Sequence, residues 1–165
     1  MKTRHSVELE GFLAAETDFH AFIVRRTDLQ VIEVSTIIDA VVEALENSSG
    51  DKSCAVVILG HSDLANNRPL ELTRSQERAD TAAAWLLGKL NEVLIVSGSL
   101  PVASWREVDT VAVEAIGMGA AHLLVPNPQN DFDRLQNRRV AFLITGNNIS
   151  SIAAFDGTAF TFGPA

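Results

Sequence analysis

The feature of this sequence that most constrains its fold is a run of five apolar residues, Ala55–Leu59 (Ala-Val-Val-Ile-Leu). A strand with one face in water alternates apolar and polar side chains, whereas a strand covered on both faces is apolar throughout. The run is far shorter than the roughly 20 apolar residues that a membrane span needs, and no other run in the chain approaches that length. It therefore predicts a central strand of a sheet that is buried on both faces.

One helix is predicted before this strand in the sequence and another after it. The first has apolar residues at offsets 0, 3, 4, 7, 8 and 11, which form one wide stripe over 34–45. Thr73, followed three residues later by Gln76, matches a capping box, so we expect the second helix to begin at Thr73. Its apolar stripe extends from Ala79 to Leu90.

Three further strands are expected, at 19–24, 109–115 and 140–144, from β-prone or alternating residues. The order is then strand, helix, strand, helix, strand, strand. It favours a two-layer α/β (α+β) sandwich with a mixed sheet and helices on one face. The residues that remain ambiguous are read as an edge strand at 93–96, a helical turn at 104–108 and an extra strand near Phe160 and Phe162.

Composition and charge exclude several classes of function. The net charge of −8 disfavours a nucleic-acid binder, because an acidic surface repels phosphate backbones. The single cysteine, Cys54, excludes an internal disulfide and a multi-cysteine metal site, and we expect it to be packed rather than reactive. His61 and His122 have no ligand spacing, so no metal or other cofactor is expected. Gly117–Gly119 lacks the third glycine of a dinucleotide fingerprint.

Charged residues gather where the central strand is expected to end. Asp63 follows the strand directly, and Arg74 and Arg78 fall in the first two turns of the expected helix. Cations at that position cost roughly 0.3–1 kcal/mol each against the helix dipole, so they are functional candidates. A guanidinium binds a carboxylate through two parallel hydrogen bonds, and Asp63 could hold an ammonium. The pair suits a zwitterion; the alternative is a surface ion pair worth about 0–1 kcal/mol.

Four short segments occur in an order that resembles a known family. They are Gly-His-Ser-Asp, Ser-Gln-Glu-Arg-Ala, Gly-Met-Gly and Arg-Leu-Gln-Asn-Arg-Arg-Val, at 60–63, 75–79, 117–119 and 134–140. Together they resemble the OmpA-like peptidoglycan-binding domain, also found in peptidoglycan-associated lipoproteins and flagellar stator proteins. The resemblance covers residues 19–146 and implies a βαβαββ fold. On this basis 1–18 is expected to be a leader, 88–108 an extended connection and 147–165 a C-terminal extension.

The resemblance also implies a ligand and its site. In the family, an aspartate and an arginine grip the amine and the carboxylate of diaminopimelate in the peptidoglycan stem peptide, and these roles fall on Asp63 and Arg78. Ser62 stands where the motif has threonine, Leu64 could offer a backbone N–H, and Arg139 could line the site. The implied function is non-catalytic anchoring to the bacterial cell wall, in the periplasm or outer-membrane-associated envelope. No export signal is visible in the chain, so the alternatives are that the protein stays in the cytoplasm or that its export segment lies outside this sequence.

The sequence departs from the family pattern near the expected site. Asn66 replaces a loop glycine three residues after Asp63, and Glu71 stands near an expected asparagine. Leu-Ser is replaced by Arg74-Ser75, and the last glutamate of the pattern by Ala141. A carboxylate at Glu71 would repel the carboxylate of the ligand unless it points away.

Two other functions remain open. One is a domain of the same fold that docks a protein partner or a second copy of itself without binding peptidoglycan, which Glu71 and the long 88–108 connection favour. The other is an enzyme, such as a hydrolase, that uses His61 and Asp63. The enzyme is disfavoured because the sequence shows no set of nucleophile and base and no metal constellation.

Overall fold

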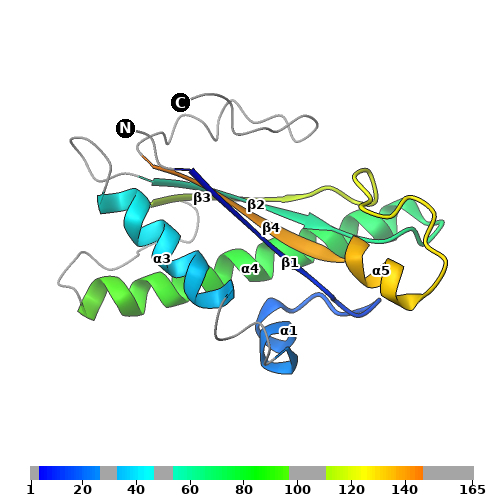
Figure 1. Ribbon diagram of the computed structural model, residues 1–165, viewed down its shortest axis with the longest axis horizontal. Coiled ribbons are helices and arrows are strands. Elements are labelled where there is room, and N and C mark those ends of the chain that lie inside the picture. The colour runs from blue at the N-terminus through cyan, green and yellow to red at the C-terminus, as the bar shows by residue number, and fades with distance from the viewer. Residues whose placement is uncertain (1–3, 27–32, 47–53, 97–110, 147–165) are drawn as a thin grey trace.

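The protein folds around a four-stranded mixed sheet with the order β1-β4-β2-β3 (Figure 1). The structure, a computed structural model, describes residues 4–26, 33–46, 54–96 and 111–146. β2 (Cys54–His61) pairs antiparallel with β4 (Arg139–Gly146) and parallel with β3 (Val111–Gly117). The predicted fold class is confirmed: a mixed sheet with helices packed against it.

The predicted central strand is confirmed, because β2 lies between two neighbours and all eight of its residues are buried. Its side chains alternate between two apolar clusters. Val56 and Ile58 belong to the large core shared with the helices, while Val57 and Leu59 join a smaller cluster with residues of β4. The continuous apolar run thus reflects burial on both faces.

Two long helices, α3 (Glu33–Glu46) and α4 (Arg68–Val96), lie on the same side of the sheet in Figure 1. α4 packs against β2 and β3, while α3 packs against β4 and β1. A Cβ atom on Gly60 would lie only 1.9 Å from the backbone oxygen of Ser75, and one on Gly117 only 2.6 Å from the backbone nitrogen of Gln76. The two glycines therefore permit α4 to approach the end of the sheet closely.

The strand expected at 19–24 is wrong, because these residues form helix α1 (Phe19–Arg25). Asp18 caps this helix, with its Oδ1 accepting a hydrogen bond from the Ala21 N–H at 3.1 Å. The buried residues are Phe19, Phe22 and Ile23, a spacing of three and four that turns one helical face to the core. The run is too short for its apolar residues to distinguish a helix from a buried strand.

The first strand is instead β1 (Arg4–Glu10), inside the segment expected to be a leader. It pairs antiparallel with β4 over seven residues, and Leu9 is 1% exposed in the main core. Residues 4–10 are therefore an edge strand of the domain's own sheet. The charged residues at the other positions of β1 are typical of an edge strand with one face in water.

The second helix starts earlier and ends later than its pattern predicts. Asn67 caps α4, with Oδ1 accepting from the Leu70 N–H at 3.1 Å, so Thr73 lies within the helix and is not its cap. The edge strand expected at 93–96 is wrong, because these residues form the last turn of α4. A short helix, α5 (Asp131–Asn137), precedes β4 and was not expected.

Several expectations fall outside the described residues: the helical turn at 104–108, the extra strand near Phe160 and Phe162, and the extension 147–165. Within the described ranges, no helix combines the length and the apolar character that crossing a membrane requires.

Candidate functional site

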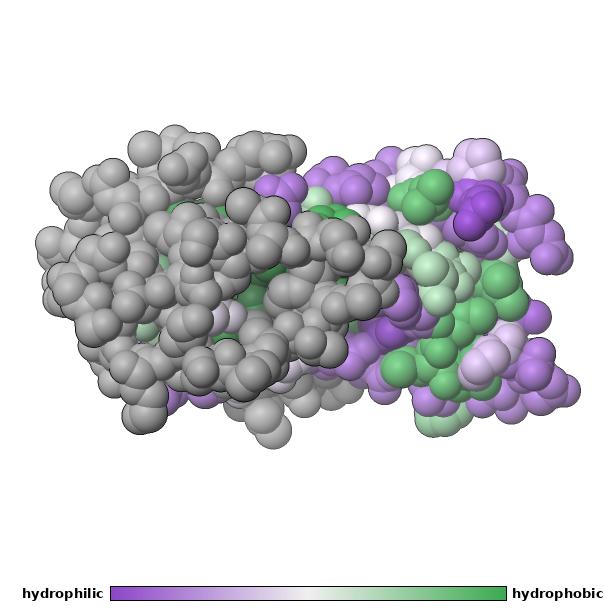
Figure 2. Space-filling model, turned by 90° about the horizontal axis from the view of Figure 1, so that it is seen from above, coloured by the Kyte–Doolittle hydropathy of each residue, from purple (hydrophilic) through white to green (hydrophobic). Residues whose placement is uncertain are grey.

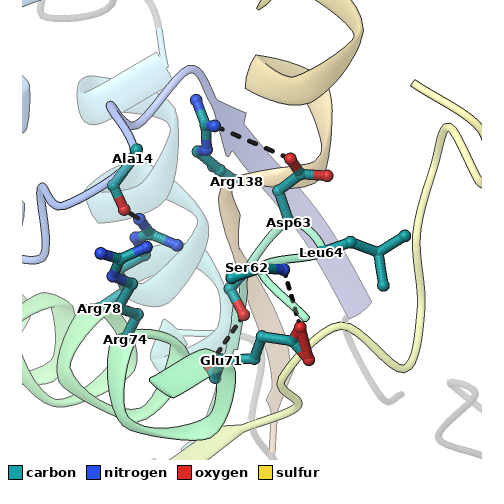
Figure 3. A pocket seen from close by; sticks show the side chains of 9 residues that line it. Ala14, Ser62, Asp63, Leu64, Glu71, Arg74, Arg78 and Arg138 are labelled. Atoms are coloured by element: carbon teal, nitrogen blue, oxygen red, sulfur yellow. Dashed lines mark hydrogen bonds and ion pairs between the residues drawn. The ribbon is translucent and has the colours of Figure 1, made fainter. Parts of the chain in front are cut away.

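A small polar pocket lies where the chain leaves β2 and passes to α4 (Figure 3). Its enclosed part has a volume of about 20 Å³, enough for roughly one water-sized group, and the pocket is partly open to solvent, so a larger ligand would extend out of it. Three arginines and two carboxylates face it. The lining residues are Ala14, Ser62, Asp63, Leu64, Ala65, Glu71, Arg74, Arg78 and Arg138.

The Asp63 carboxylate is held by two side chains of α5 and by Arg138, the residue that follows α5. Its side chain is 4% exposed and forms an ion pair with Arg134, whose Nη1 lies 2.9 Å from Oδ2. The Asn137 side-chain amide donates to Oδ1 at 2.9 Å, and Arg138 Nη2 lies 3.8 Å from Oδ2. The buried carboxylate is thus both paired and hydrogen-bonded, as a buried charge requires.

Arg78 is fully buried, and its guanidinium donates to four backbone carbonyls. Nε donates to Glu16 at 2.8 Å, Nη1 to His61 at 3.0 Å, and Nη2 to Leu13 and Ala14 at 3.1 Å each. These bonds occupy four of the five N–H groups of an arginine. Burial lowers the pKa of Arg78 to about 10, so the side chain remains charged at neutral pH. Arg78 therefore fastens the segment before α1 to the end of β2.

The alternative interpretation of Asp63 and Arg78 as a surface ion pair is wrong. Both side chains are buried, and the ion pairs of Asp63 within the described part of the chain are those with Arg134 and Arg138. The two groups nevertheless line the same pocket. Arg78 also lies ten residues after Arg68, the first residue of α4, so the dipole at the N-terminus does not act on it as expected.

The loop after β2 is closed by Glu71. Glu71 Oε2 accepts from the Ala65 N–H at 2.9 Å, and the Ser62 hydroxyl donates to the Glu71 carbonyl at 2.8 Å. Asn66 has φ +53°, the left-handed conformation for which the family pattern uses glycine and which asparagine tolerates better than most residues. Leu64 is 42% exposed at the rim of the pocket. Ser62 thus helps to order the loop after β2.

The glycine turn at 117–119 is hydrogen-bonded to α4 and to the loop after β2. The Gly119 N–H donates to the Ser75 hydroxyl at 2.8 Å, and the Gly119 carbonyl accepts from the Ser62 N–H at 2.9 Å. Gly119 has φ +57°, which favours glycine. The motif elements that the sequence separates by dozens of residues are therefore joined directly around the pocket.

Arg139, expected to line the site, does not line this pocket. Its guanidinium bonds to Glu8 of β1 and to the carbonyls of Asn137 and His122, at 3.3 and 2.8 Å. Successive residues entering a strand point to opposite faces, so Arg138 faces the pocket and Arg139 faces away.

His61 is 5% exposed, and its Nδ1 has no hydrogen-bond partner. Burial lowers the pKa of His61 to about 3, with Arg139 and His122 acting in the same direction, so His61 is neutral at physiological pH. Cys54 is buried as expected, and burial raises the pKa of its thiol to about 12. Across the described ranges, no three His, Cys, Asp or Glu side chains are arranged to hold a metal ion.

Sequence reasoning missed the partners of both key charges. Arg134 and Asn137 hold Asp63, and the carbonyls of Leu13, Ala14 and Glu16 hold Arg78. A usable signal for α5 exists in the sequence: Asn130 stands three residues before Asp133, and its side chain caps the helix at 2.9 Å. No local pattern indicates the carbonyl contacts of Arg78.

Apolar side chains are exposed on the loop after β2, on the segment before α5 and on α5 itself. Leu64, Leu124 and Phe132 are 42%, 48% and 72% exposed. Figure 2 shows apolar patches bordered by hydrophilic residues at the end of the molecule that carries α5.

No protein-family model matches the chain, and no curated protein matches it either. Among solved structures, it is similar to the peptidoglycan-associated lipoprotein from Burkholderia pseudomallei, with 14% identity and a TM-score of 0.44 over 84% of this chain and 88% of that one. It is also similar to the cell wall anchor of the T6SS from Pseudomonas aeruginosa, with 21% identity and a TM-score of 0.43 over 87% of this chain and 81% of that one. A MotB-like protein from Desulfovibrio vulgaris has 19% identity and a TM-score of 0.49 over 86% of this chain and 72% of that one.

One of these solved structures is a peptidoglycan-associated lipoprotein, a group of proteins that the sequence motifs also resemble. At these identities and TM-scores the likeness concerns the arrangement of sheet and helices alone.

Proposed function

We propose that this domain binds peptidoglycan without catalysing a reaction, and that it anchors its protein to the bacterial cell wall within the envelope. The proposed ligand group is the free end of diaminopimelate in the stem peptide, which carries an ammonium and a carboxylate on one carbon. The observation that carries the proposal is the convergence of Asp63 and three arginines on one pocket, whose lining includes residues of three of the four motifs that resemble the family.

The electrostatics of the pocket support a zwitterionic ligand. A carboxylate has about four lone-pair sites, and the two side-chain hydrogen bonds to Asp63 occupy one on each oxygen. Asp63 can therefore accept a ligand ammonium while it remains bonded to Arg134 and Asn137. The arginines outnumber the carboxylates in the lining, which favours a ligand carboxylate beside the ammonium.

The test is a calorimetric titration of the full chain with a muropeptide that contains diaminopimelate. We expect Asp63→Asn, which removes the charge at nearly constant volume, to weaken binding by about 30-fold or more, since losing one partner of a buried charged contact costs about 2 kcal/mol or more. Asp39→Asn, on the exposed side of α3, is the matched control and should bind like the wild type. Equal affinity of wild type and Asp63→Asn would contradict the proposal.

A further inference from the structure

Arg78, the residue that the family motif assigns to the ligand carboxylate, has little capacity left for it. Four of its N–H groups donate to carbonyls of the chain, and its side chain has no exposed surface. A carboxylate prefers two parallel N–H groups of one guanidinium. Arg78 can present that pair only if the segment before α1 releases it, so the bidentate contact requires another arginine.

Arg74 lies one helical turn before Arg78 on α4 and lines the same pocket (Figure 3). It is half-buried, and within the described part of the chain its guanidinium has no hydrogen bond and no ion pair. Glu71, three residues earlier on the helix, gives one oxygen to the Ala65 N–H and forms no ion pair with Arg74. The N–H groups of the Arg74 guanidinium are thus available to a ligand.

The pocket concentrates positive charge around Arg74. Burial and, after it, the charges of Arg138 and Arg74 lower the pKa of Arg78. Burial also lowers the pKa of Arg138; the charges of Asp63 and Asp131 oppose this shift, while those of Arg134 and Arg74 add to it. Neighbouring like charges repel one another, and a bound anion would relieve this repulsion. The family pattern has leucine at the position of Arg74, so this third guanidinium is a feature of this chain.

We propose that Arg74 binds the carboxylate of the ligand through its two parallel N–H groups, while Arg78 holds the segment before α1 against β2. The inference rests on the proposed function, because the carboxylate is that of the diaminopimelate end. Asp63 keeps its contact with the ammonium, so the two ends of the zwitterion are divided between the end of β2 and the second turn of α4.

The experiment compares two muropeptides, one with diaminopimelate and one with lysine, which lacks the terminal carboxylate. Wild type should prefer the diaminopimelate ligand by about tenfold or more, and Arg74→Gln should lose that preference by weakening only the diaminopimelate complex. Arg68→Gln is the matched control, an exposed arginine of the same helix outside the pocket, and should keep the preference. Arg74→Gln should keep or slightly raise the melting temperature of the wild type, because it removes one of three neighbouring positive charges, whereas Arg78→Lys should lower it.

Each outcome separates the two proposals. A wild type that prefers diaminopimelate, with an Arg74→Gln variant that keeps this preference, would overturn the role of Arg74 and leave the proposed function standing. An Arg78→Lys variant that keeps full thermal stability but loses the preference would also overturn it, because Arg78 would then be the binding group. A wild type that binds neither muropeptide would overturn the proposed function itself.

Discussion

The buried charges of Asp63 and Arg78 have their partners within the fold itself. Arg134 forms an ion pair with Asp63 and Asn137 donates a hydrogen bond to it, while backbone carbonyls accept hydrogen bonds from Arg78. A buried charge without such partners would cost several kcal/mol, so these contacts are a condition for placing the two side chains beneath the surface. Residues that a motif marks for binding can therefore carry a structural role at the same time.

His61 predicts a pH dependence of stability. The pKa of its folded form, about 3, lies below the ordinary value of 6.5, so between these values the unfolded chain binds one more proton than the folded chain. The free energy of unfolding should then fall as pH falls below about 6.5, by up to roughly 1.4 kcal/mol per pH unit. Urea unfolding at pH 6.5, 5.5 and 4.5 should show this slope in the wild type and a shallower one in His61→Gln. His20→Gln, on the exposed side of α1, should keep the wild-type slope; an unchanged slope in His61→Gln would be evidence against the neutral buried imidazole.

Among the elements, α4 does most to build the site, since it carries Glu71, Arg74 and Arg78 and packs closely on the end of the sheet. Its N-terminus is set by Asn67 rather than Thr73. The five residues between these two positions add more than a turn and move both arginines away from the helix end.

The position of this cap can be measured. Asn67→Ala should lower the free energy of unfolding by about 1 kcal/mol, because the Leu70 N–H loses its acceptor. Thr73→Ala, an exposed change within the helix, should raise it by a few tenths of a kcal/mol, since alanine is the better helix former. The opposite ranking in denaturant unfolding would place the start of the helix at Thr73.

For the whole molecule, β1 closes one edge of the sheet and joins the N-terminal segment to the domain. It pairs with β4, and through Glu8 it also bonds to Arg139 beside the site. Although the chain carries a net charge of −8, three arginines line this one pocket. The pocket is thus a locally positive site on an acidic protein, which favours a small anion over a polyanion.

The integration of β1 predicts a large effect of one apolar residue. Leu9→Ala should lower the free energy of unfolding by about 3 kcal/mol, because Leu9 is 1% exposed in the main core. Leu13→Ala, at 49% exposure in the next segment, should cost less than about 1 kcal/mol. Chemical denaturation of both variants would check this, and a loss below 1 kcal/mol for Leu9→Ala would show that the segment is a leader after all.

Local patterns alone predict β2, α3 and β4, because each carries an apolar period long enough to identify itself, and motif order alone predicts that Asp63 and Arg78 share a site. Contacts between distant parts of the chain settle the rest. α1 is a helix because Phe19 and Phe22 must meet Phe12 and the core, and β1 is a strand because β4 offers it an edge. Arg78 reaches carbonyls 62 to 65 residues away, and Asp63 reaches groups 71 and 74 residues away. No local period records such pairings, because the free energy that they contribute exists only when the folded chain brings their partners together.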